Sequence, residues 1–134
     1  MSRKAARDCA FKLIFEIPFH DGLTPDERIN LFFEYGETED INSNDKDYIV
    51  LTVNDCYNNL NIVDEKISTS LENWRIERLS KVDLSILRLA VSEIMYNKDI
   101  PFKVSVNEAV ELAKTYGEDS SPSFVNGVLS KLEN

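Results

Sequence analysis

The stretch "SKVDLSILRLAVSEIMYN", Ser80 to Asn97, decides the fold. When these residues are placed at 100° intervals around a helix, the apolar positions nearly encircle it. The narrow polar stripe that remains consists of Ser85, Arg88, Ser92 and Tyr96. A helix that is apolar almost all round is buried among other helices. We therefore expect this segment to be the central helix of a bundle.

Glu93 falls inside the apolar arc of this helix, next to Leu89 and Ala90. A buried carboxylate needs a partner, because an unpaired buried charge is costly. The expected role of Glu93 is a structural bond to a nearby helix end or to an Asn, Lys or Arg side chain, in preference to catalysis.

The rest of the chain also has helical periodicity, and its 134 residues are enough for one domain. Only 4 Gly and 4 Pro are present, which is too few for the turns of an all-β protein. The predicted fold is all-α, a compact bundle of about seven short helices. They are expected at residues 3–17, 25–35, 45–60, 62–71, 80–97, 105–116 and from 121 onward.

Short motifs predict where several helices begin and end. "TPDE" places Thr24 and Glu27 in a capping box, and "SVNE" predicts a second box from Ser105 to Glu108. Gly117 stands where a left-handed C-terminal cap belongs.

The composition argues against a metal site and against an enzyme. His20 is the single histidine, so neither a zinc ligand set nor a nucleophile triad can be assembled. The motifs GxxxxGK[ST] and GxGxxG, which hold phosphates, are both absent. We expect no catalytic residues, no metal and no cofactor.

The same composition predicts a cytoplasmic protein. No apolar run approaches the roughly 18 residues of a membrane span, and the N-terminus has no apolar signal region. Cys9 and Cys56 each fall on an apolar stripe, so two reduced and buried thiols are expected.

Charge is distributed unevenly along the chain. The net charge is −9, which argues against broad nonspecific binding to nucleic acid. Residues 1–12, however, hold four basic side chains and one acid, for +3, and leave −12 for the remainder. This asymmetry predicts a local basic patch on an acidic body.

The first helix carries the one pattern that points to a ligand. Arg3, Arg7 and Phe11 recur every four residues on its predicted outer face, and Lys4 and Phe15 flank them. Cations beside exposed aromatic rings suit single-stranded RNA, because the cations bind phosphates and the rings stack on bases. The alternative is ordinary: aromatic residues on a helix usually belong to the core, and basic residues are common at chain ends.

Between Trp74 and Leu129 the chain contains, in order, the motifs "VDLSILRLAVSE", "NEAVELAK", "YG" and "FVNGVL". In this combination the C-terminal half resembles the NusB family of bacterial transcription antitermination factors. The stretch "RKAARDCAFKLIF" also resembles the arginine-rich first helix of that family.

This resemblance implies a fold of two small subdomains, approximately residues 1–72 and 73–134. It also implies binding to boxA-type RNA of ribosomal RNA leaders, together with NusE, a small-subunit ribosomal protein. Through further Nus factors, the assembly would act on RNA polymerase. The RNA contacts that the resemblance transfers to this sequence are Arg3, Lys4, Arg7, Phe15 and Phe124.

The first helix has fewer arginines than is usual in the family, so RNA binding without NusE is expected to be weak. The alternative function is a helical protein–protein adaptor or a homodimer with no RNA role of its own, which the acidic body favours slightly. The sequence assigns neither the residues that face NusE nor a role for the acidic loop at residues 37–47.

Gly127 interrupts the last helix, where a glycine costs about 1 kcal/mol relative to alanine. Two explanations remain open. In the first, which we favour, a neighbouring helix of the same domain packs closely against the bare backbone. In the second, RNA stacked near Phe124 passes over it.

Overall fold

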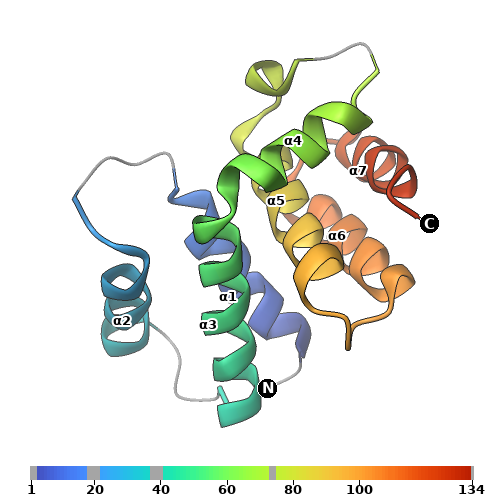
Figure 1. The fold of residues 1–134 in the computed structure, drawn as a ribbon. Coiled ribbons are helices and arrows are strands. Elements are labelled where there is room, and N and C mark those ends of the chain that lie inside the picture. Colours follow the sequence, from blue (N-terminus) through green and yellow to red (C-terminus); the bar gives the residue numbers. More distant parts are fainter. Residues whose placement is uncertain (1–2, 18–21, 37–40, 73–74, 134) are drawn as a thin grey trace.

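A computed structural model describes residues 3–17, 22–36, 41–72 and 75–133, and within these ranges all regular structure is helical (Figure 1). His20, Trp74 and residues 37–40 of the acidic loop lie outside the described residues. The α-helices are α1 (Arg3–Phe15), α2 (Pro25–Tyr35), α3 (Ser43–Asn58), α4 (Leu60–Ser70), α5 (Lys81–Tyr96), α6 (Phe102–Tyr116) and α7 (Ser121–Ser130). A short 3-10 helix, η1 (Ile76–Arg78), precedes α5. The prediction of an all-α fold is confirmed.

Helix α5 is the central helix, as its apolar circumference predicts. It packs against α1, α3, α4, α6 and α7 (Figure 1). Its residues Ile86, Leu87 and Val91 are completely buried. Helix α2 packs on α3, toward the outside of the bundle (Figure 1). A mostly hydrophobic helix therefore organises the N-terminal and C-terminal halves around one core.

Most of the polar stripe of α5 is also buried, because α4 covers it. Ser85 and Ser92 are satisfied within the helix, where each hydroxyl donates to the carbonyl four residues earlier at 2.7 Å. Arg88 donates two hydrogen bonds of 2.9 Å to the carboxylate of Asp64 on α4. The stripe thus joins two helices.

Of the two predicted capping boxes, one is confirmed and one is wrong. The amide of Glu27 donates to the Thr24 hydroxyl at 3.1 Å, and the amide of Thr24 donates to the Glu27 carboxylate at 3.0 Å. Helix α6, in contrast, begins a full turn before the expected position, directly after Pro101. Ser105 is therefore inside the helix and buried, and its hydroxyl donates a hydrogen bond to Glu93 of α5.

Gly117 ends α6, but the predicted left-handed conformation is wrong. Its φ of −91° and ψ of −172° are open to any residue. The glycine is needed for space: a Cβ here would lie 2.6 Å from the Ser121 side chain and 2.8 Å from the carbonyl of Ala113. Ser121 begins α7, so the bare backbone lets α6 and α7 join closely.

Alanine substitutions at Gly117 and Gly127 are expected to have opposite effects on stability. Gly117→Ala should lower the free energy of unfolding by about 1–3 kcal/mol, because the added methyl overlaps atoms of α6 and α7. Gly127→Ala should raise it by up to about 1 kcal/mol, because a Cβ there meets no atom within 4 Å. Urea unfolding of the two variants measures both values, and the same sign for both would contradict this explanation.

The prediction of two buried, reduced thiols is confirmed. Cys9 and Cys56 are buried free thiols, and burial raises the pKa of Cys56 to about 11. Both therefore resemble small core residues more than reactive thiolates. No helix in the described ranges is long and apolar enough to cross a membrane.

Candidate nucleic-acid interface

Arg7 and Phe11 do not lie on an outer face of α1, and this part of the sequence prediction is wrong. Arg7 and Phe11 are each only 4% exposed. Helix α6 covers a second side of α1: Phe11 stacks on Tyr116 of α6 with ring centres 4.9 Å apart. A buried Arg7 cannot serve as a surface contact for phosphate.

Arg7 is instead one member of a buried polar cluster centred on Glu93. The Arg7 guanidinium donates to the two carboxylate oxygens of Glu93 at 2.9 and 3.1 Å. The hydroxyl of Ser105 donates to Oε1 of the same carboxylate at 2.9 Å, and the Tyr48 hydroxyl donates to Oε2. These four residues come from α1, α3, α5 and α6, so the cluster fixes α1 against the rest of the bundle.

The protonation states of this cluster follow from burial and from the Glu93 charge. Burial by itself lowers the pKa of Arg7, but the hydrogen bond and the negative charge of Glu93 outweigh it, and the pKa is raised. Burial, followed by the charge of Glu93, strongly raises the pKa of Tyr48. Arg7 therefore remains a cation and Tyr48 a neutral donor.

Arg3 extends this cluster to the surface. Its guanidinium lies 4.6 Å from the centre of the Tyr48 ring, and its Nε donates to Asp45 at 3.0 Å. The side chain remains 40% exposed. Arg3 is thus held in one orientation by α3, with part of its charge already balanced and part available to a phosphate.

The other cations of α1 stand among carboxylates. Lys4 is exposed and lines a pocket of about 320 Å³ whose wall includes Asp8, Glu108 and Glu111. Lys12 forms an ion pair with Asp8 at 3.1 Å. Of the basic patch predicted for the first helix, only Arg3, Lys4 and Lys12 reach the surface, and nearby acids reduce their net charge.

Phe15 lies half-buried at the end of α1, with its ring centre 6.2 Å from that of Phe11. It lines a pocket of about 460 Å³ together with Lys12, Tyr116 and Val82, the second residue of α5. The ring and the apolar wall offer a stacking surface, whereas the Lys12 cation is paired with Asp8 and the Glu16 carboxylate also lines the pocket.

Phe124 lies half-buried in the first turn of α7 and lines a second pocket of about 460 Å³. Arg78 of η1 and Ser80 and Asp83 at the start of α5 form the facing wall. Because Val82 and Asp83 are consecutive, the two pockets lie on either side of the first turn of α5. We call the lining of these two pockets the Phe15–Phe124 surface.

Two features of the Phe15–Phe124 surface suit nucleic acid beyond its rings. The starts of α5 and α7 present helix N-termini, whose backbone amides favour phosphate. Asp83 lines the Phe124 pocket, but its Oδ1 is buried and accepts no hydrogen bond from any described residue, so its side chain would have to turn before this oxygen could bond to a base. Sequence reasoning missed Asp83 and Arg78, although "RIERLSKVD" places both beside the predicted central helix.

The parts of the chain that the structure describes hold no group of three or more His, Cys, Asp or Glu side chains arranged for a metal ion. Half-buried rings, scattered cations and helix N-termini on an all-helical body are features of helical nucleic-acid-binding proteins. The NusB family profile matches residues 4–134, and the chain belongs to the NusB family.

Similar proteins include "Transcription antitermination protein NusB" of Natranaerobius thermophilus, which is 44% identical over 100% of this chain and 96% of its own length. The solved structure of T. maritima NusB is 34% identical, with a TM-score of 0.86 over 98% of this chain and 90% of that chain. A structure of the antitermination factors NusB and NusE in complex with dsRNA is 30% identical, with a TM-score of 0.83 over 97% and 94%.

Proposed function

We propose that this protein is a transcription antitermination factor that binds boxA-type RNA of ribosomal RNA leaders together with NusE. It would recruit this assembly to RNA polymerase through further Nus factors, in the bacterial cytoplasm where transcription takes place. The protein acts by binding alone, and its site carries no chemical step.

The observation that carries this proposal is the Phe15–Phe124 surface on a NusB fold. Two aromatic rings stand at opposite ends of a surface that also contains Lys12 and Arg78. Stacking on separated rings requires unpaired bases, because bases within a duplex are already stacked on each other. The proposed ligand is therefore single-stranded RNA, with Arg3 and Lys4 at the other end of α1 as the proposed phosphate contacts.

Arg7 keeps a role in this proposal, but an indirect one. Its bond to Glu93 fixes α1 in the bundle, and the same cluster holds the Tyr48 ring on which Arg3 stacks. Arg7 is therefore a positioning residue for the surface that Arg3, Lys4 and Phe15 present.

Replacing either Phe15 or Phe124 with leucine should weaken RNA binding by about five- to a hundredfold, because stacking on one ring contributes that much per base. Leucine preserves most of the apolar volume, so thermal unfolding should change little. Fluorescence titration of a labelled single-stranded boxA RNA, in the presence of NusE, measures the effect.

Phe102→Leu is the matched control. Phe102 is also a half-buried phenylalanine, and it is the first residue of α6. Tyr116, which lines the Phe15 pocket, is the last residue of α6, so Phe102 lies about 20 Å along the helix from that pocket. Equal RNA affinities of all three variants and the wild type would overturn the assignment of the Phe15–Phe124 surface. The expected pattern for Phe15→Leu and Phe124→Leu is weakened RNA binding with unchanged NusE binding.

If the wild type binds NusE but binds RNA under no condition, the protein–protein adaptor function replaces this one.

A further inference from the structure

Gly127 occupies a position in α7 that nothing within the described chain explains. Glycine is the poorest helix former after proline, and this one lies in the interior of a ten-residue helix. Its backbone is ordinary helix, since Gly22 alone among the described glycines has a positive φ. A Cβ at Gly127 would meet no atom within 4 Å, so the expected close packing of a neighbouring helix is wrong.

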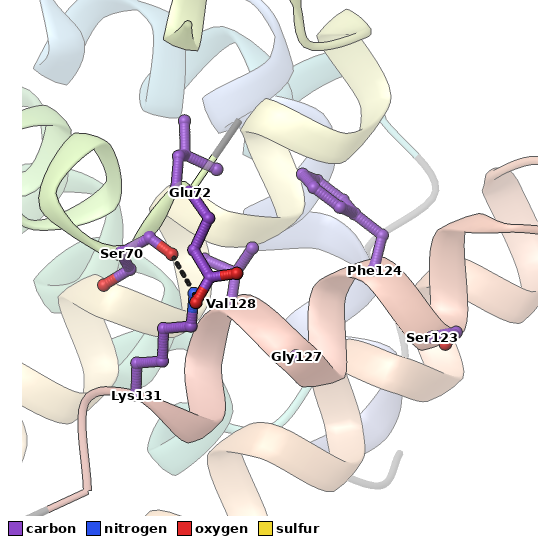
Figure 2. Close-up of a pocket in the computed structure, with 8 residues that line it drawn as sticks. Ser70, Glu72, Ser123, Phe124, Gly127, Val128 and Lys131 are labelled. Atoms are coloured by element: carbon purple, nitrogen blue, oxygen red, sulfur yellow. Dashed lines mark hydrogen bonds and ion pairs between the residues drawn. The ribbon is translucent and has the colours of Figure 1, made fainter. Parts of the chain in front are cut away.

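The missing side chain leaves open a pocket between α4 and α7 (Figure 2). Its volume is about 300 Å³, which corresponds to roughly ten water molecules. Ser70, Leu71 and Glu72 form one wall at the end of α4, and Ser123, Phe124, Gly127, Val128 and Lys131 form the other. Gly127 is an exposed part of this lining, so a long side chain at position 127 can reach into the space.

The pocket combines apolar walls with a paired donor and acceptor. Leu71, Val128 and Phe124 provide apolar surface. Lys131 Nζ lies 2.9 Å from Oε1 of Glu72 and donates to the carbonyl of Ser70 at 3.1 Å (Figure 2). Because Lys131 and Glu72 are both exposed, they can turn toward a ligand while one charge balances the other.

Phe124 connects this pocket to the Phe15–Phe124 surface, because it lines both this pocket and the pocket that contains Arg78 and Asp83. A strand of RNA that stacks a base on Phe124 reaches the Gly127 pocket with its next nucleotide. The lining suits an occupant that combines an apolar face with hydrogen-bond donors and acceptors and carries little net charge, which fits an unpaired nucleobase. A cationic or acidic protein segment finds no net charge to match here.

From these contacts we propose that the Gly127 pocket is a subsite for one unpaired nucleobase, adjacent to the base that stacks on Phe124. This inference rests on the proposed RNA-binding function and extends its binding surface along α7 toward the end of α4. Gly127 is then glycine because a side chain would occupy the place of the base.

Gly127→Leu is the direct test, because Gly127 lines the pocket and its added Cβ meets no atom of the fold within 4 Å. Asn126→Leu is its matched control: Asn126 is an exposed residue of the same helix that does not line the pocket. With labelled single-stranded boxA RNA and NusE, Gly127→Leu should weaken binding by about five- to a hundredfold. Asn126→Leu should leave it within about twofold, and both variants should melt at or above the wild-type temperature.

A scan of single abasic nucleotides through the same RNA identifies the base. One position should weaken binding to the wild type and cause no further loss with Gly127→Leu, because the two changes remove the same contact. Wild-type RNA affinity of Gly127→Leu would overturn the subsite while leaving the proposed function intact. Full RNA affinity with loss of NusE binding would assign the pocket to a protein partner, whereas failure of the wild type itself to bind RNA would remove the proposed function first.

Discussion

Replacing Glu93 with alanine is expected to lower the free energy of unfolding by about 3–5 kcal/mol, the range seen when one partner of a buried ion pair is removed. Glu93 is 2% exposed and accepts hydrogen bonds from Arg7, Tyr48 and Ser105. Without it, the Arg7 cation stays buried with no opposite charge, and two hydroxyl donors lose their acceptor. For a domain of this size, the melting temperature should fall by on the order of 10–20 °C.

Arg7→Ala should destabilise the protein by a similar amount, because it leaves the Glu93 carboxylate buried and unpaired. A surface Arg7, as the periodicity of the first helix predicts, could be removed at little cost. Glu111→Ala provides the control: its ion pair with Lys114, at 3.4 Å, is exposed, so the loss should stay below about 1 kcal/mol. Urea unfolding distinguishes these cases, and wild-type stability of both Glu93→Ala and Arg7→Ala would contradict the role of the cluster.

The central helix could be predicted from sequence because its apolar residues lie on nearly every side, and this pattern alone indicates a buried helix. The same reasoning succeeded at Thr24 and Glu27, where a local motif closes within four residues. The cap depends only on residues close in sequence. The burial of the central helix depends only on its apolar pattern, whichever helices pack against it.

Arg7 shows where this reasoning fails. Its partner Glu93 is 86 residues away in the sequence. The buried structural role of Glu93 was predicted, but Arg7 was assigned to the outer face of the first helix. One helix pattern shows which face is the most apolar, but it cannot show that a second neighbour covers a polar face as well. Ser105 was misassigned for the same reason, because its hydroxyl could cap a helix locally or bond to a buried acceptor on α5.

The candidate interface was predictable in part. Phe15 and Phe124 were available through family resemblance, and the structure places both half-buried on pockets. Asp83 was not available, because an unpartnered buried oxygen is visible only once its surroundings are known. The Gly127 pocket was also hidden, since a glycine in sequence does not reveal whether the space above it is filled.

NusE is expected to tighten boxA binding by at least tenfold, or about 1.4 kcal/mol of coupling. With Arg7 buried, the proposed phosphate contacts on α1 are reduced to Arg3 and Lys4, and Arg3 already pairs with Asp45. Two such contacts give a salt dependence with a slope of about −1.4 for single-stranded RNA. The rest of the chain, at −12, repels any RNA beyond this patch. A basic partner adds phosphate contacts and screens that repulsion, and its attraction to the acidic body speeds assembly.

The measurement that tests this account most directly is a titration of labelled boxA RNA with the protein alone, with NusE alone, and with the two proteins mixed. All three titrations use the same moderate salt concentration, and an RNA of equal composition and scrambled order serves as the control. The account predicts a dissociation constant at least tenfold lower for the mixture than for either protein, and no such gain for the scrambled RNA. By linkage, boxA must lower the dissociation constant between this protein and NusE by the same factor. Equal dissociation constants for the protein alone and for the mixture would contradict the account.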